Sequence, residues 1–117
     1  MEFRLLLLAF AMCIFIAACA YDNAEDLYGK VSCPPEGVSF ASDILPITSS
    51  NCAIPGCHIS GQQLPTLQTY EQISANAPKV RDLTSGGIMP PSTSGKTITP
   101  EEIDLISCWV ESGAPDN

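Results

Sequence analysis

The sequence of 117 residues predicts an all-α, loop-rich fold, and three observations carry that prediction. Three segments combine helix-capping residues with apolar residues at helical spacing. No segment of the sequence keeps the alternation of apolar and polar residues that indicates a strand. Glycine, proline and serine are frequent between the helical segments. We therefore expect three to four short helices joined by long loops.

The first 18 residues have the features of an export leader. Arg4 is followed by an apolar run, residues 5–18, that is short for a membrane-spanning helix. The run ends in Ile-Ala-Ala before Cys19, which resembles a bacterial lipobox. We expect residues 1–18 to be a lipoprotein signal peptide and Cys19 to carry lipid, with multiple acyl chains giving a stable anchor. The alternative is an ordinary secretory signal cut at small residues.

The sequence after the leader predicts an anchored envelope protein with one small domain. Residues 19–37 are expected to form the lipidated N-terminus and a flexible acidic stalk, and residues 38–117 the folded domain. This places the protein in the bacterial cell envelope, on the periplasmic side or at the cell surface. The part after the leader has four basic and twelve acidic residues, a net charge of −8 (4 − 12). Such a charge argues against nucleic acid as a partner and allows steering toward a basic redox partner, although solubility alone would also explain it.

The helices are expected in three places. The first begins near Ser39 or Ser42, where Pro46 limits or kinks it unless it falls in the first turn. The second begins after Thr69 and covers residues 70–75, with a further turn at 79–83 after the interruption Asn-Ala-Pro.

The third expected helix has the most complete set of signals. Thr99 is a cap, Pro100 takes the first helical position, and Glu102 completes a capping box. A glycine at 113 and a proline at 115 end it. Its apolar face consists of Ile103, Ile106 and Val110, with Leu105 and Trp109 beside them.

Two thiols and an imidazole stand together at Cys52, Cys57 and His58, in the order Cys-Ala-Ile-Pro-Gly-Cys-His. Thiols can add across the two vinyl groups of a haem, and a histidine directly after the second thiol can ligate the iron. The motif is widened, with four residues between the cysteines in place of two, and Pro55-Gly56 can supply a turn that absorbs the extra length. The alternatives are a local disulfide or a zinc site that lacks a fourth ligand.

Met89 is the single methionine left once the leader is removed, and His58 is the single histidine. A histidine and a methionine form the axial pair of an electron-transfer haem c. Of the six cysteines, Cys13 would leave with the leader, Cys19 would carry lipid and the two motif cysteines would bind haem. The remaining two, Cys33 and Cys108, are the number that one disulfide requires. A loop of that length is worth about 4 kcal/mol in the chain-entropy model. The alternative is a pair of buried free thiols.

From Val38 onward the chain resembles a small class I c-type cytochrome, with one haem and a lipoprotein anchor. The resemblance rests on an ordered set of segments: the helix 39–50, the motif 52–58, Gly-Gln-Gln-Leu-Pro-Thr-Leu at 61–67, Gly-Ile-Met-Pro-Pro at 87–91, and the helix 99–112.

The resemblance implies a cytochrome c-like fold packed around one covalently attached haem c. His58 and Met89 would be its metal ligands, the carbonyl of Pro65 would accept a hydrogen bond from the His58 ring, and Trp109 would pack on Phe40. The haem would be walled by Ile54, Leu64, Leu67, Leu83 and Ile88. With no open position on the iron, we expect an electron carrier rather than an enzyme. The alternatives are a haem-bearing accessory subunit or sensor, or a disulfide-stapled envelope lipoprotein without a cofactor.

Overall fold

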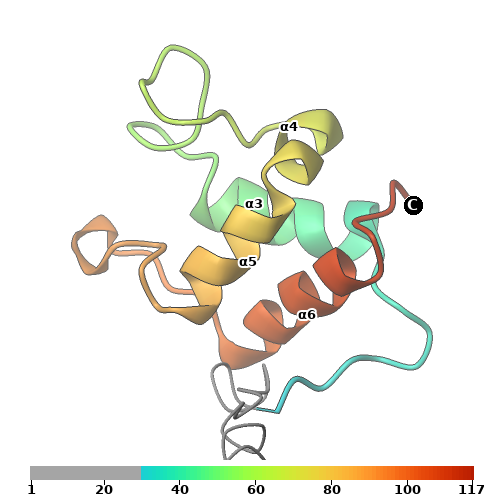
Figure 1. Ribbon diagram of the computed structural model, residues 1–117. Helices are drawn as coiled ribbons and strands as arrows, with labels where there is room; N and C mark the ends of the chain where they lie inside the picture. The colour runs from blue at the N-terminus through green and yellow to red at the C-terminus, as the bar shows by residue number, and fades with distance from the viewer. Residues whose placement is uncertain (1–29) are drawn as a thin grey trace, which may run out of the picture.

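A computed structural model describes residues 30–117, and within that part every regular element is a helix and no strand occurs. The elements are η1 (Phe40–Ile44), α3 (Leu45–Asn51), α4 (Tyr70–Ala75), α5 (Ala77–Ser85), η2 (Ser92–Ser94) and α6 (Pro100–Glu111). The predicted all-α class is confirmed for these residues. α5 packs along α6, which also contacts η1, while the loops 52–69 and 86–99 project on one side of the helices (Figure 1).

The first helix begins with a wide turn and then tightens. The Ser39 side chain caps it by accepting from the backbone N–H of Ser42. η1 is π-helical, with the N–H of Leu45 donating to the carbonyl of Phe40, and α3 continues from it with Pro46 in its first turn. Proline has no N–H and its ring collides with the carbonyl four residues earlier in a regular α-helix. The wider π turn before Pro46 removes that conflict, so the expected kink becomes a change of helix type.

The middle helices are separated by one residue rather than three. α4 starts after Thr69 as predicted, but α5 begins at Ala77, earlier than the expected turn at 79–83. Pro78 lies in the first turn of α5, where its missing N–H has no helical partner to lose. Asn76 makes the break by donating its side-chain amide to the carbonyl of Gln72, 2.8 Å away.

α6 follows its sequence signals closely. Glu102 accepts from the Thr99 N–H at 2.8 Å, and the Glu102 N–H donates to the Thr99 hydroxyl at 3.2 Å, which is the predicted capping box. The helix ends before Gly113, whose positive φ of 95° suits a residue without a side chain.

Trp109 lies at the centre of the core and is fully buried. Its ring centroid is 5.7 Å from that of Phe40, which in turn meets Tyr70 edge-on at 5.1 Å. The indole N–H donates to the carbonyl of Pro115, so the buried polar atom is satisfied. The expected contact between Trp109 and Phe40 is confirmed. The apolar core consists of Val38, Phe40, Ile44, Ile47, Cys52, Leu67, Ile73, Ala77, Ile106, Cys108 and Trp109.

The last described residue closes the fold on the first helix. The Asn117 side chain accepts from the Phe40 N–H at 2.8 Å, and its backbone carbonyl accepts from the Ala41 N–H at 3.0 Å. These bonds satisfy donors at the start of η1 that have no partner within the helix.

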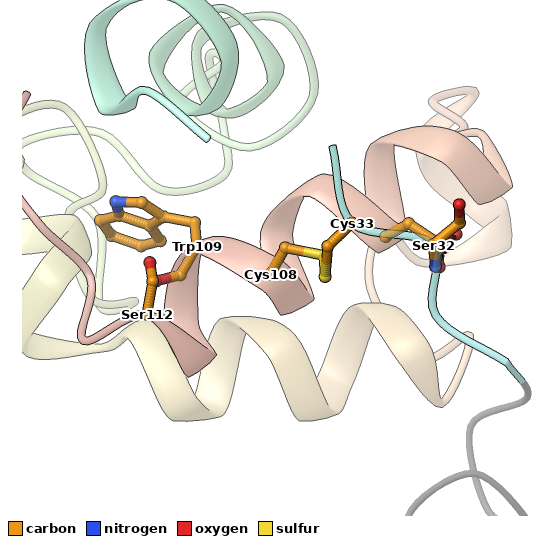
Figure 2. Close-up of a disulfide and its surroundings, with 6 residues drawn as sticks. Ser32, Cys33, Cys108, Trp109 and Ser112 are labelled. Atoms are coloured by element: carbon orange, nitrogen blue, oxygen red, sulfur yellow. Dashed lines mark hydrogen bonds between the residues drawn. A yellow bond between two sulfur atoms is a disulfide. The ribbon is translucent and has the colours of Figure 1, made fainter. Parts of the chain in front are cut away.

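The N-terminal arm, residues 30–39, is joined to α6 by a disulfide between Cys33 and Cys108, as predicted (Figure 2). The two Cα atoms are 5.7 Å apart, within the range for such a bond. One residue earlier, the Ser32 N–H donates to a carboxylate oxygen of Asp104 at 3.1 Å. The indole of Trp109, the next residue along α6, points away from the disulfide (Figure 2).

The expected signal peptide 1–18, the lipidation site Cys19 and the first part of the stalk lie outside the described residues. Among residues 30–117, no helix is both long enough and apolar enough to cross a membrane.

Candidate functional site

The widened cysteine motif folds back on itself. α3 ends at Asn51 with Cys52 as its C-cap, and the N–H of Cys57 donates to the carbonyl of Ile54 across a tight turn, at 3.0 Å. Gly56 has a φ of 84°, which the predicted Pro55-Gly56 turn requires. The N–H of His58 then donates to the carbonyl of Cys52 at 3.1 Å. The turn takes up the extra residues, so the two ends of the motif meet.

The His58 ring has one nitrogen engaged and one available. Nδ1 lies 2.7 Å from the carbonyl oxygen of Pro65, which is the contact that the resemblance implies. A carbonyl can only accept, so Nδ1 carries the proton and Nε2 keeps its lone pair. The Leu67 N–H donates to the His58 carbonyl at 3.0 Å and holds the two sides of this loop together. The ring is thereby oriented as a ligand of a metal ion would be.

Met89 is placed by a turn that follows α5. The N–H groups of Ile88 and Met89 both donate to the carbonyl of Leu83, at 2.9 and 3.0 Å. Gly87 has a φ of 66°, a conformation that favours glycine, and it lets the chain reverse here. The turn brings Met89 back toward the loop that holds His58.

Cys52, His58 and Met89 together border two neighbouring hollows. We call them the α5 hollow and the loop hollow. Their empty volumes, which include space open to solvent, are about 410 and 420 Å³. The α5 hollow is lined by Cys52, His58, Pro65, Leu67, Asn76, Lys79, Val80, Leu83, Thr84 and Met89. The loop hollow is lined by Asn51, Cys52, Cys57, His58, Leu64, Met89, Pro90, Pro91 and Ser94.

The structure therefore brings every predicted cofactor-binding residue to one place. Of the expected apolar wall, Leu64, Leu67 and Leu83 line a hollow. Ile54 and Ile88 line neither, and Ile88 is 58% exposed, because the turn after α5 directs its side chain outward. Sequence reasoning missed that α5 contributes a whole face.

The two thiols of the motif are free and differ in burial. Cys52 is buried and Cys57 is half-buried. Burial, followed by charge repulsion from the nearby Cys57 thiol, raises the pKa of Cys52 to about 11. Both thiols are reduced and not joined to each other, and Cys52 is protonated at neutral pH. This is the state in which an S–H bond can add across a carbon–carbon double bond.

The donor set of the lining residues suits a haem. The lining offers one imidazole nitrogen, one thioether and two thiols against a largely apolar wall. No carboxylate lines either hollow. Within residues 30–117, no group of three or more His, Cys, Asp or Glu side chains is placed to hold a metal ion.

Comparison of the chain with protein-family models, with curated proteins and with solved structures found no match.

Proposed function

We propose that this protein is a monohaem c-type cytochrome that carries single electrons in the bacterial cell envelope. The observation that carries the proposal is the His58 ring, which donates from Nδ1 to Pro65 and faces the same two hollows as Met89 and Cys52. The single histidine and the single methionine outside the leader thus lie on one apolar site beside two reduced thiols.

The attachment step needs two thiols and no oxidant. Each S–H of Cys52 and Cys57 would add across one vinyl group, with sulfur bonding one carbon and hydrogen the other. His58 would offer the Nε2 lone pair, and Met89 its thioether sulfur. When bound, haem supplies a reversible one-electron couple, and a histidine–methionine pair favours a higher potential than two histidines would.

The protein's own residues then exclude water and substrate. His58 and Met89 would occupy both axial positions, which leaves no place for a reacting molecule and argues against an enzyme. Leu67 is buried and Leu83 half-buried against the α5 hollow, so they keep the local dielectric low. Leu64, which is 44% exposed, borders the loop hollow, and this edge would exchange electrons with partners.

The proposed location is the envelope, with lipid on Cys19 as the membrane anchor. The disulfide between Cys33 and Cys108 supports export, because such bonds persist in oxidising compartments. The net charge of −8 supports a redox partner with a basic docking face rather than nucleic acid.

A pyridine haemochrome spectrum after acid–acetone extraction tests the proposal. Haem should stay on the polypeptide, with the spectrum of two thioether bonds. Cys52→Ser should shift the spectrum to that of a single thioether, whereas Cys33→Ser, the same exchange at a cysteine outside both hollows, should leave it unchanged. Complete loss of haem from the wild-type chain on extraction would exclude a c-type cytochrome.

A further inference from the structure

The side chains through which α5 borders the α5 hollow differ in polarity along the helix. Its members are spaced as neighbours on one side of a helix and are Asn76, Lys79, Val80, Leu83 and Thr84. The polar members Asn76 and Lys79 stand at the beginning of the helix. The apolar members Val80 and Leu83 follow, and the carbonyl of Leu83 accepts from Met89. The α5 hollow therefore has Asn76 and exposed Lys79 at one end, where they border it through their carbon atoms, and Val80, Leu83 and Thr84 toward the other.

Lys79 is the single charged side chain that lines either hollow. In the part of the chain that the structure describes, the one ion pair joins Arg81 and Asp82, so no carboxylate among residues 30–117 forms an ion pair with Lys79. An ammonium group at the border of an apolar hollow, with no carboxylate around it, suits an anionic group on the occupant.

Haem has the matching distribution of groups. Its two vinyl groups lie on one edge and its two propionate carboxylates on the opposite edge. Cys57 lines the loop hollow and not the α5 hollow, whereas Lys79 lines the α5 hollow and not the loop hollow. Cys57 and Lys79 thus border different hollows, while Cys52 lines both, and a haem with its vinyl edge at Cys57 would turn its propionate edge toward Lys79.

We propose that Lys79 is a positioning residue that pairs with a propionate carboxylate of the haem. The inference rests on the proposed function and adds to it the orientation of the cofactor, with its propionate edge at the start of α5. The charge balance gives the physical reason. Two propionates would add negative charge to a chain whose net charge is already −8, and Lys79 offsets part of that repulsion at the point of contact.

The test compares Lys79→Gln with Lys79→Arg and with the control Lys96→Gln. Lys96 lies between η2 and α6 and lines neither hollow, but its substitution removes the same charge. The reduction potential of each haem-bearing protein is measured as a function of pH. Lys79→Gln should shift the potential downward, because a lost positive charge favours ferric iron. The pH-dependent part of the profile, where the propionate titrates, should move to higher pH.

Lys79→Arg should restore both the reduction potential and its pH profile. Lys96→Gln should move the pH profile much less than Lys79→Gln does. Equal profiles in the Lys79→Gln and Lys96→Gln proteins would overturn the pairing and leave the proposed function standing. A downward shift without a change in the pH profile would also overturn it, since that is the effect of charge loss alone. If extraction shows that the wild-type chain binds no haem, the proposed function fails and this inference fails with it.

Discussion

One hydrogen bond fixes the orientation and the tautomer of the His58 ring. The carbonyl of Pro65, seven residues further on, fixes the proton on Nδ1 and leaves Nε2 as an acceptor. Met89 has no such hydrogen bond through its side chain and is placed by its backbone, which bonds to Leu83. Because the chain outside the leader has no second histidine or methionine, neither residue has a substitute of its own kind.

Met89→Ala should leave haem covalently bound and open its sixth position to carbon monoxide or cyanide. The potential should fall, since the thioether favours ferrous iron, and the weak far-red absorption of a sulfur–iron bond should disappear. Absorption spectra with and without added cyanide measure this. Ile88→Ala is the matched control, because that side chain is exposed and lines neither hollow. Unchanged spectra and ligand access in Met89→Ala would refute the assignment of the axial pair.

The two motif thiols should also react at different rates in the chain without haem. With a pKa of about 11, roughly one Cys52 side chain in a thousand is a thiolate at pH 8. Iodoacetamide should therefore label half-buried Cys57 well before buried Cys52, and mass spectrometry of peptides reads the ratio. In guanidinium the difference should vanish, as both thiols are then solvated. Equal labelling of the native chain would contradict the burial of Cys52.

At the scale of elements, α6 is the scaffold on which the other parts assemble. It carries Trp109 toward Phe40 and holds the N-terminal arm through Cys108. α5 packs along α6 and presents a different face to the hollow. α6 therefore joins the parts of the core, whereas α5 lines the α5 hollow.

Removing the disulfide tests the role of α6 as a scaffold. The pair Cys33→Ala with Cys108→Ala should lower the free energy of unfolding by up to about 4 kcal/mol, because the bond closes a long loop in the unfolded chain. Haem content should be unchanged, as neither cysteine lines a hollow. Denaturant unfolding with and without reductant provides the measurement. If reductant lowers the free energy of unfolding of the double variant as much as that of the wild type, the effect of reductant does not come from this disulfide.

Within residues 30–117, the N-terminal arm and the candidate site lie on different parts of the molecule. The arm is fixed to α6 at Cys108, while the thiols and ligands lie on loops joined to α3 and α5. Among residues 30–117, none before Asn51 lines either hollow. This arrangement would suit the proposed electron carrier, because residues 30–50 stay outside the site that partners would reach.

Cys19→Ser should release the protein from membranes into the soluble fraction with its haem intact. The lipid bond would be lost, and the folded domain contributes no membrane-spanning helix within residues 30–117. Cys13→Ser serves as the control, because Cys13 would be removed with the leader. Fractionation after a carbonate wash measures the outcome. Retention of the Cys19→Ser protein on membranes would count against a lipid at that residue.

Local chemistry made several parts of this protein predictable from sequence. The capping box of α6, the start of α4 at Thr69 and the turn at Pro55-Gly56 all depend on residues within a few positions of one another. The disulfide followed from counting the cysteines. The helical class followed from spacing and from the absence of strand patterns.

Tertiary structure decided the remainder. Pro46 is accommodated by a π turn, and Pro78 by the first turn of a longer α5, neither of which the local pattern specified. The lining of the α5 hollow depends on how α5 rotates against α6. That rotation turned Asn76 and Lys79 toward the site, while the turn after α5 left Ile88 exposed. Spacing along the chain determines which residues share a helix face, but the packing of other elements decides which face lines the candidate site.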